Sequence, residues 1–166
     1  MIKFLCAVGL LLSMALQSHA TELPPATGPV LLEVSGLIDN TNFQDKARLD
    51  NNILKSWPQA DFIAQTYWTD GEHEFSGFLA RDMINALGAS GRTVKAVAQD
   101  GYSTDIPFAV LESTGALFAM QMDGKPMQST GRGAIWLVFP ELIHKDYPKK
   151  QFRNFWVWQL KALSFR

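Results

Sequence analysis

The sequence predicts an α+β fold in which short strands, joined by turns, alternate with few and short helices. Three observations support this class. Strand-like alternation or short apolar runs recur along most of the chain, one segment alone has strong helical periodicity, and no internal repeat or second domain boundary is evident. The 166 residues, 47% of them hydrophobic and five of them tryptophan, suffice for one domain with a sizeable core.

The first 20 residues have the composition of a secretory signal peptide. Lys3 supplies a positive charge, residues 4–16 form an apolar run too short for a membrane-spanning helix, and Ser18-His19-Ala20 is a small-x-small cleavage site. We therefore expect a soluble, periplasmic product that begins at or near Thr21. The single cysteine, Cys6, lies inside the signal segment, so the exported protein would contain no thiol and no disulfide.

The charge balance argues against nucleic acid as a partner. Beyond the signal segment, 14 basic residues face 16 acidic ones, because Lys3 is the single charged residue that cleavage removes. A net charge near −2 lacks the basic surplus that neutralises a phosphate backbone.

The predicted domain spans residues 30–166 and follows an extended arm. Residues 21–29 (TELPPATGP) are polar and rich in proline, which is typical of an extended segment. The apolar run VLLEV at 30–34 predicts a strand, and Asp39-Asn40 predicts the turn that follows it.

A short helix and a hairpin are expected next. Asp50 can cap a helix over residues 51–57, whose apolar residues share one face, and Pro58 would end it. Alternating side chains over residues 61–68 predict a strand, and Thr69-Asp70-Gly71 predicts a hairpin turn that returns the chain.

The strongest helix signal lies at residues 79–87. Leu79, Met83, Ile84 and Leu87 recur at helical spacing, and Gly88 stands where a left-handed cap would end the helix.

The rest of the chain predicts mainly strands and turns. Strands or extended pieces are expected at residues 93–99, up to Pro107, at 116–122 and at 134–139, with turns at 100–101 and 123–126. Residues 154–163 (NFWVWQLKAL) are ambiguous, because Trp156 and Trp158 alternate as in a strand while Trp156, Gln159, Leu160 and Leu163 fit one helix face.

The patterns of common catalytic sites are missing from the sequence. His73 and His144 have no metal-ligand spacing to a second histidine and are expected to be solvated loop residues. No G-x-S-x-G elbow is present, and Gly131-Arg132-Gly133 is too short for a dinucleotide-binding loop. An ordinary hydrolase is therefore disfavoured.

Six segments, taken in order, resemble the molybdopterin-binding domain of the sulfite oxidase superfamily. They are LEVSGLI (32–38), FSGFLARDMI (75–84), DGYSTDIP (100–107), MDGKPM (122–127), GRGAIWLVFP (131–140) and WVWQL (156–160). No single segment is specific, but their order over about 130 residues carries the resemblance. It implies an α+β fold of layered, mixed β-sheets with few short helices, in agreement with the prediction made element by element.

One departure from the family concerns the metal ligand. In the enzymes of that family a cysteine thiolate binds molybdenum, and the corresponding strand here has Ala64-Gln65-Thr66-Tyr67. No side chain in this stretch can replace a soft thiolate. The sequence therefore disfavours enzymatic oxygen transfer, and we expect no metal.

Small exported proteins of this superfamily that lack the thiolate look like periplasmic pterin-binding regulatory proteins. The resemblance implies a non-enzymatic protein that binds a free, reduced pterin without molybdenum. It also implies a relay of the pterin status to the periplasmic domain of a membrane-bound receptor that controls cyclic diguanylate signalling. Two alternatives stay open, namely a molybdopterin-dependent oxidoreductase with an unusual or absent protein metal ligand, and a partner-binding relic of the fold without a ligand.

A pterin site requires an aromatic platform and a few convergent polar groups in a concave pocket. The matched segments offer three kinds of candidate: the aromatic residues Trp68, Tyr102 and Trp136, the carboxylates Asp100 and Asp105, and the donors or acceptors Thr66, Ser103 and Arg132. Arg132 is the leading candidate, because flanking glycines permit close approach to a ring carbonyl or phosphate.

Each candidate has a structural alternative. Trp136 stands in AIWLVF, the pattern of a buried strand, and Asp100 precedes a glycine as turn residues often do. Trp57, Trp156 and Trp158 are assigned to packing. A run of basic and aromatic residues is a candidate docking surface or a solvated loop: Lys145, Tyr147, Lys149, Lys150, Phe152 and Arg153.

Overall fold

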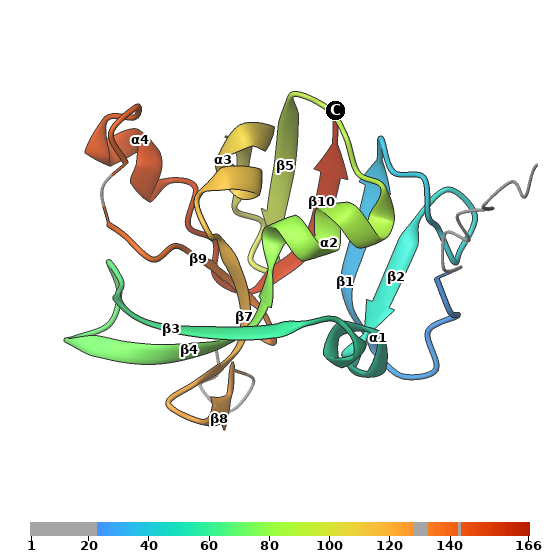
Figure 1. The fold of residues 1–166 in the computed structure, drawn as a ribbon, viewed down its shortest axis with the longest axis horizontal. Helices are drawn as coiled ribbons and strands as arrows, with labels where there is room; N and C mark the ends of the chain where they lie inside the picture. Colours follow the sequence, from blue (N-terminus) through green and yellow to red (C-terminus); the bar gives the residue numbers. More distant parts are fainter. Residues whose placement is uncertain (1–22, 128–132, 143) are drawn as a thin grey trace, which may run out of the picture.

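A computed structural model describes residues 23–127, 133–142 and 144–166. The predictions for the signal segment, for a start at Thr21 and for Arg132 lie outside these residues. The described part of the chain confirms the α+β prediction. It contains one mixed sheet, one antiparallel sheet and four short helices (Figure 1). No helix in these ranges is long and apolar enough to cross a membrane.

The first sheet has five strands and contains a parallel pair. Its strands, in spatial order, are β2 (Ala47–Asp50), β1 (Val30–Gly36), β10 (Leu160–Phe165), β5 (Thr93–Ala98) and β6 (Ser103–Pro107). β1 and β10 run parallel, whereas their other neighbours are antiparallel. The last strand of the chain therefore lies at the centre of the sheet.

The second sheet is antiparallel and begins with a long hairpin. Its strands are β3 (Gln59–Gln65), β4 (Glu72–Leu79), β7 (Leu117–Met122) and β8 (Lys125–Pro126), with β9 (Trp136–Val138) also paired to β7. The predicted hairpin at residues 61–75 is confirmed, since β3 and β4 pair from Gln59 with Phe78 to Gln65 with Glu72.

Four short helices connect these strands. They are α1 (Asn51–Ser56), α2 (Ala80–Leu87), α3 (Phe108–Ser113) and α4 (Lys149–Arg153). α2 and α3 contact each other, while α4 and α1 lie near opposite ends of the molecule (Figure 1).

Asp50 caps α1 as predicted and also holds the preceding arm. Its carboxylate accepts hydrogen bonds from the backbone N–H groups of Ile53 at 3.0 Å, Thr27 at 2.7 Å and Gly28 at 2.8 Å. These bonds lower the pKa of Asp50 to about 2, because they favour the charged carboxylate. Residues 23–29 thus run without regular secondary structure but are tied to the domain.

The predictions for α2 and its cap are confirmed. Met83, Ile84 and Leu87 are buried, and Gly88 adopts the left-handed conformation with φ 58° and ψ 37°. The next backbone N–H, that of Ala89, donates to the carbonyl of Ile84 at 2.9 Å. Glycine tolerates this conformation without the clash that a Cβ atom would introduce.

Several local predictions require correction. Residues 125–126 form β8 rather than part of a turn, and β9 covers three residues of the expected 134–139. The ambiguous segment is not helical, because β10 starts at Leu160 and Val157 pairs with Leu137 before it. The sequence also did not predict α3 and α4, which follow Pro107 and Pro148 without a side-chain cap.

The prediction that both histidines are solvated loop residues is wrong for His73 and holds in part for His144, which lies in the segment between β9 and α4 but is half-buried. His73 lies on β4, where Nδ1 is 2.7 Å from a carboxylate oxygen of Asp123 and Nε2 is 3.0 Å from the carbonyl of Asp70. His144 packs against the rings of Tyr147 and Phe152. Neighbouring aromatic and acidic side chains therefore fix both rings.

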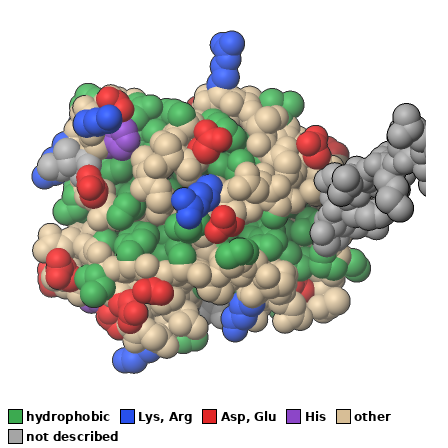
Figure 2. Space-filling model, in the orientation of Figure 1, with side chains coloured by type: hydrophobic (Ala, Val, Ile, Leu, Met, Phe, Trp, Pro, Cys, Tyr) green, Lys and Arg blue, Asp and Glu red, His purple; other side chains and the backbone are tan. Residues whose placement is uncertain are grey.

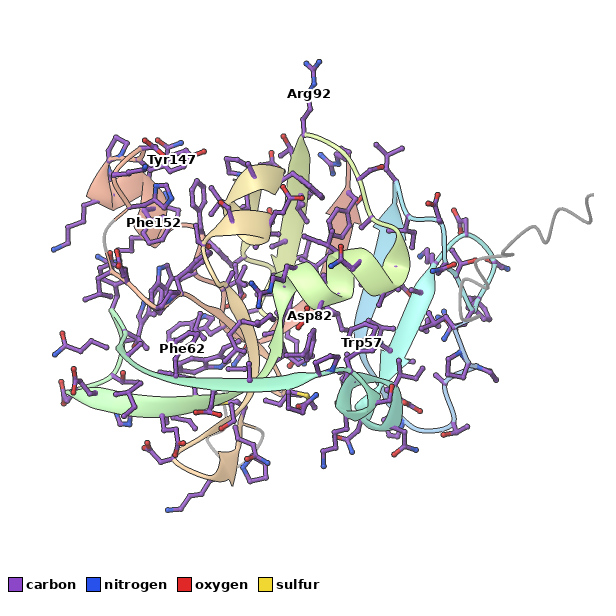
Figure 3. All side chains as sticks on the ribbon, viewed as in Figure 1. Trp57, Phe62, Asp82, Arg92, Tyr147 and Phe152 are labelled. Atoms are coloured by element: carbon purple, nitrogen blue, oxygen red, sulfur yellow. The ribbon has the colours of Figure 1, made fainter. Side chains whose placement is uncertain are left out.

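Large aromatic side chains fill the core around both sheets. The largest fully buried ones are Phe75, Phe78, Phe118, Trp136, Phe139, Phe152 and Phe165. Figure 3 shows Phe62 and Trp57 with the side chains around them, and both pack against this core. On the surface, charged side chains of both signs are scattered among apolar and polar ones on the face that Figure 2 shows.

Candidate functional site

A cavity of about 370 Å³ brings together three segments that are far apart in the sequence. The loop after β3 contributes Trp68, the turn between β5 and β6 contributes Asp100 and Tyr102, and α4 with the segment after it contributes the rest. The residues that line the cavity are Trp68, Asp100, Tyr102, Lys150, Arg153, Asn154, Trp156 and Trp158.

Indole rings form one wall of this cavity. The ring centroids of Trp68 and Trp158 are 5.5 Å apart at an interplanar angle of 38°, and those of Trp68 and Trp156 are 6.2 Å apart at 58°. Because these rings already contact one another, a flat ligand would stack on an outer ring face rather than between them. The wall therefore provides an aromatic platform with apolar character.

The position of Trp68 follows from the turn that carries it. The Thr66 hydroxyl accepts hydrogen bonds from the backbone N–H groups of Trp68 and Thr69, both at 3.1 Å, and lies 2.8 Å from the Thr69 hydroxyl. A threonine that bonds to the backbone two and three residues ahead closes a tight turn. Thr66, 7% exposed, thus holds Trp68 at the end of β3.

Polar groups also border the cavity. The Tyr102 hydroxyl donates to the carbonyl of Asn154 at 2.9 Å, and the Tyr102 backbone N–H donates to a carboxylate oxygen of Asp100 at 2.9 Å. These bonds link the β5–β6 turn to the segment after α4. One oxygen of Asp100 is used in the turn, which leaves the carboxylate with further capacity to accept.

Two cations border the cavity beside this single carboxylate. The guanidinium carbon of Arg153 lies 5.9 Å from the ring centroid of Trp68 and 5.4 Å from that of Tyr67, within the range of cation–π interactions. Lys150 lies one helical turn earlier on α4 and is exposed. The lining is therefore net positive and rich in hydrogen-bond donors.

Trp156 contributes a buried donor without an acceptor. Its side chain is 2% exposed, and its indole N–H has no hydrogen-bond partner in the described part of the chain. Leaving such a donor unsatisfied costs about 1–3 kcal/mol. Trp156 is among the lining residues, but its Nε1 atom is itself enclosed by protein atoms, so a ligand acceptor reaches this donor only where neighbouring side chains move aside.

The structure places the sequence-predicted residues in three groups. Trp68, Asp100 and Tyr102 line the cavity together. Thr66 and Trp136 stand behind the wall, since Trp136 is 2% exposed and packs on Trp158 at 6.1 Å. Ser103 and Asp105 do not line the cavity and are exposed on the edge strand β6. The prediction for Arg132 lies outside the described ranges.

Sequence reasoning missed five residues of the lining, Lys150, Arg153, Asn154, Trp156 and Trp158. The assignment of Trp57 to packing agrees with its contact with Phe78, at 5.3 Å between ring centroids. A usable signal was the W-x-W alternation directly after a basic run, which puts stacking rings and cations in one segment. Phe152, which was included in the docking surface, is 1% exposed and belongs to the core instead.

In the stretch where the resemblance would place a metal-binding cysteine, Ala64 and Thr66 are buried and Tyr67 is half-buried, whereas Gln65 is exposed. Ala64 is 5% exposed on β3 opposite His73, and the Tyr67 hydroxyl donates to the carbonyl of Leu142. Burial raises the pKa of the Tyr67 phenol, and the nearby Arg153 charge opposes this shift. Within the described ranges no three His, Cys, Asp or Glu side chains lie close enough to hold a metal ion.

Comparisons with known proteins support the fold. No family model matches the chain, and no curated protein matches it. Among solved structures, the sulfane dehydrogenase SoxCD from Paracoccus pantotrophus is similar, with a TM-score of 0.59 and 16% sequence identity over 80% of this chain. This chain covers 37% of that one. The similarity shows that the mixed α+β fold is related to that of this sulfane dehydrogenase.

Proposed function

We propose that the protein binds a free pterin in the tryptophan-walled cavity, without molybdenum and without catalysis. The observation that carries this proposal is the cavity in which the indole rings of Trp68 and Trp158 meet two cations and one carboxylate. A pterin has a flat aromatic face, ring acceptors and an amino-pyrimidinone edge. The flat face complements the indole rings, the ring acceptors complement the cationic donors, and the amino-pyrimidinone edge complements the carboxylate.

Each lining group has a defined role in this proposal. The pterin stacks on the exposed face of Trp68 or Trp158, and the Asp100 carboxylate accepts hydrogen bonds from the 2-amino group and N3. Arg153 and Lys150 donate to ring acceptors or to an anionic substituent. Arg132 stays a candidate for the same role, and Ser103 and Asp105 stay candidates at the edge strand.

The proposed biological role is a relay. The protein reports the status of a reduced pterin to the periplasmic domain of a membrane-bound cyclic diguanylate enzyme. The resemblance of the six segments and the replacement of the cysteine by the Ala64–Tyr67 stretch support this role. The proposed docking residues, once the buried Phe152 is excluded, are the exposed Lys145, Lys149, Lys150 and Arg153 and the half-buried Tyr147.

The second candidate function is a molybdopterin-dependent oxidoreductase with an unusual or absent protein metal ligand. The fold similarity to a sulfane dehydrogenase favours this alternative. The two functions differ in metal content, since the oxidoreductase requires molybdenum near one equivalent, whereas the pterin binder requires none.

Calorimetric titration with tetrahydropterin tests the site. Trp68→Ala should weaken binding at least fivefold, because an aromatic stack is worth about 0.5–1.5 kcal/mol in addition to buried area. Arg153→Ala should weaken it about tenfold or more, because a charge-assisted hydrogen bond is worth about 1.5–3 kcal/mol. Arg132→Ala tests the remaining candidate in the same way.

Lys149→Ala is the matched control, since Lys149 is exposed on α4 but does not line the cavity. Binding by this variant should equal that of the wild type. If folded Trp68→Ala and Arg153→Ala bind tetrahydropterin as tightly as the wild type, the site is misplaced. If the wild type itself does not bind, the pterin proposal fails.

A further inference from the structure

β3 forms an edge of the second sheet, and its outer side pairs with no described strand (Figure 1). The strand pairs with β4 along all 7 of its residues without a register shift. Outside this ladder, the backbone groups of residues 60–65 form no hydrogen bond with described residues. Ile63, at 66% exposure, is the most exposed large hydrophobic residue of the described ranges. Such an edge is a template for pairing with another chain.

The backbone groups of Asp61, Ile63 and Gln65 point outward from this edge. On β4, the Glu74 carbonyl accepts the N–H of Asp123 at 2.8 Å, and the Glu74 N–H donates to the Asp123 carboxylate at 3.1 Å. Glu74 therefore directs both of its backbone groups away from β3. Because this direction alternates along a strand, Ile63, which lies opposite Glu74, directs its N–H and C=O to the free edge. Asp61 and Gln65 do the same by the same alternation.

The two edges of the first sheet are protected against such pairing. β2 has 4 residues, and the Asn42 side chain bonds to both backbone groups of Arg48, at 2.7 Å to the N–H and 2.9 Å to the carbonyl. β6 carries the exposed charge of Asp105 and ends in Pro107, which has no N–H to donate. Short length, side-chain caps, charges and proline all oppose the addition of a further strand.

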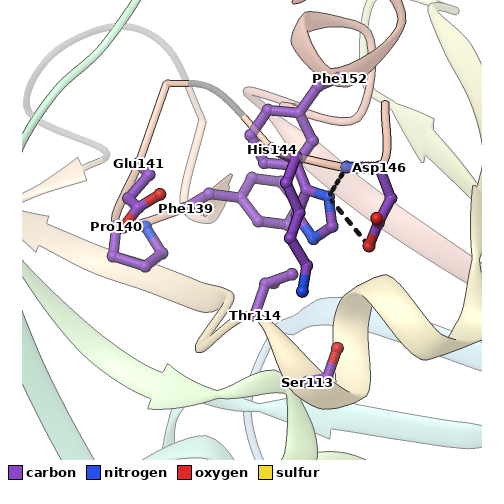
Figure 4. Close-up of a pocket in the computed structure, with 9 residues that line it drawn as sticks. Ser113, Thr114, Phe139, Pro140, Glu141, His144, Asp146 and Phe152 are labelled. Atoms are coloured by element: carbon purple, nitrogen blue, oxygen red, sulfur yellow. Dashed lines mark hydrogen bonds and ion pairs between the residues drawn. The ribbon is translucent and has the colours of Figure 1, made fainter. Parts of the chain in front are cut away.

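The far edge of the second sheet is protected as well. β8 consists of Lys125–Pro126 alone. β9 is covered by the chain after α4, because Leu137 and Val157 exchange backbone hydrogen bonds at 2.7 and 3.3 Å. Figure 4 shows Phe139, just after β9, beside Phe152 of α4, with 5.0 Å between the ring centroids. β3, by contrast, contains no proline, no lysine and no bulge.

The sequence of β3 also suits pairing with itself. Residues 59–65 read QADFIAQ, with glutamine at both ends and alanine next to each of them, around a centre at Phe62. When two copies pair antiparallel about this centre, all seven residues are used, and the ends match in kind. Opposite residues then share a face of the sheet, so the exposed and the half-buried faces of β3 each continue into the second copy.

We propose that two copies of this chain form a symmetric dimer by antiparallel pairing of β3 with β3, centred on Phe62. In this register Asp61 exchanges backbone hydrogen bonds with Ile63 of the second copy, and each carboxylate lies opposite an apolar side chain. A register centred on Asp61 would instead place two carboxylates directly opposite each other, which destabilises a strand pair. The dimer is independent of pterin binding, because no residue of β3 lines the tryptophan-walled cavity.

The side chains at the junction complement one another in this register. The Gln59 amide nitrogen donates to the carbonyls of Leu54 at 3.0 Å and Trp57 at 2.8 Å in its own chain. Its amide oxygen remains to accept from the Gln65 amide of the second copy. On the inner face, the half-buried Phe62 rings of the two copies meet as a cross-strand aromatic pair, a favourable contact.

Sedimentation equilibrium from micromolar to millimolar concentration tests the dimer. The wild type should dimerise, and Ile63→Asp should raise the dimer dissociation constant at least tenfold, because it sets a carboxylate opposite Asp61 twice in each dimer. Adding Asp61→Lys to Ile63→Asp should restore dimerisation. Leu37→Asp is the matched control, since Leu37 is 52% exposed and lies outside β3, and it should dimerise as the wild type does. Circular dichroism checks that each variant is folded. A wild type that stays monomeric at millimolar concentration, or equal dissociation constants for Ile63→Asp and the wild type, would overturn the proposal.

Disulfide cross-linking tests the register. Directly opposite residues of a hydrogen-bonded antiparallel pair have Cα atoms about 5.5 Å apart, which a disulfide can bridge. Asp61→Cys and Ile63→Cys, each combined with Cys6→Ser to remove the one natural cysteine, should cross-link at least tenfold faster when mixed than either variant does alone. No cross-link in the mixture, or equal rates in the mixture and the separate variants, would show that the pairing about Phe62 is wrong.

Discussion

The indole N–H of Trp156 is the residue-scale feature that most needs a ligand. The other large aromatic side chains of the site need no ligand for their packing. The indole N–H of Trp156, by contrast, is buried and has no acceptor in the described ranges. An unsatisfied buried donor weakens the folded state, so a ligand acceptor would gain from meeting it.

We predict that Trp156→Phe weakens tetrahydropterin binding by about twofold to tenfold. The substitution removes the donor but retains an aromatic ring, and a neutral hydrogen bond contributes about 0.5–1.5 kcal/mol. Trp57→Phe is the matched control, because Trp57 packs on Phe78 away from the cavity. Calorimetry below the unfolding transition of each variant measures the effect. Equal affinities in Trp156→Phe and the wild type would refute a bond to this nitrogen.

A second residue-scale prediction concerns the capping carboxylate Asp50. Its pKa in the folded protein is about 2, below the ordinary 3.8, because three backbone N–H groups bond to the charged form. A group with a lowered folded pKa stabilises above its unfolded pKa, and this contribution disappears as the pH falls through the folded value.

Asp50→Ala should therefore unfold at a lower temperature than the wild type at neutral pH. The gap in melting temperature should stay constant down to about pH 4 and shrink between about pH 4 and pH 2. Thermal unfolding followed by circular dichroism at several pH values measures this gap. A gap that is independent of pH over the acidic range would show that the charge of Asp50 contributes nothing.

At the scale of elements, the second sheet depends on close contact between β4 and β7. A Cβ atom added at Gly77 would lie 2.0 Å from the carbonyl oxygen of Phe118, next to the register shift at Ser76 and Gly77. The neighbouring atom is backbone and cannot move independently of the sheet.

Gly77→Ala should destabilise the protein by about 1–3 kcal/mol, the usual cost of overpacking a core. Gly28→Ala is the control, since its added Cβ atom would meet Asp50 at an ordinary 3.6 Å. Urea unfolding of both variants measures the difference in free energy of unfolding. If the two substitutions have the same effect, the contact between β4 and β7 is looser than described.

The predictability of each element follows from how much of its cause is local. α1 and α2 were predictable because Asp50, Pro58 and Gly88 mark their ends in the sequence. α3 and α4 were not, because they follow prolines without a side-chain cap and have five or six residues, too few for a periodic pattern. The β3–β4 hairpin was predictable because its sequence contains both the alternating side chains of a strand and the residues of a tight turn.

The site was predictable only where the sequence resembles the sulfite oxidase superfamily. Asp100 and Tyr102 lie in one of the six similar segments, Trp68 follows the stretch compared with the metal-ligand strand, and the three meet in the cavity. Lys150, Arg153, Trp156 and Trp158 join them through contacts between the β3–β4 loop and the segment after α4, which no local pattern reveals. The same long-range packing places Trp136 behind the wall rather than in it.

At the scale of the whole molecule, the fold is related to that of a sulfane dehydrogenase and contains a cavity lined by indole rings and charged side chains. The stretch Ala64–Tyr67, where a metal-binding cysteine would be expected, contains no thiol. This combination is the basis of the central claim, that the protein holds a pterin without molybdenum. The claim therefore concerns the pterin and molybdenum content of the isolated protein.

The most direct test is the ligand content of the protein purified under reducing conditions. We predict that acid treatment releases a compound with pterin fluorescence, close to one equivalent per chain, and that molybdenum is far below one equivalent by elemental analysis. Trp156→Phe protein purified in parallel should carry less pterin. Molybdenum near one equivalent, accompanied by turnover of an oxygen-donor substrate, would contradict the claim and establish the oxidoreductase instead.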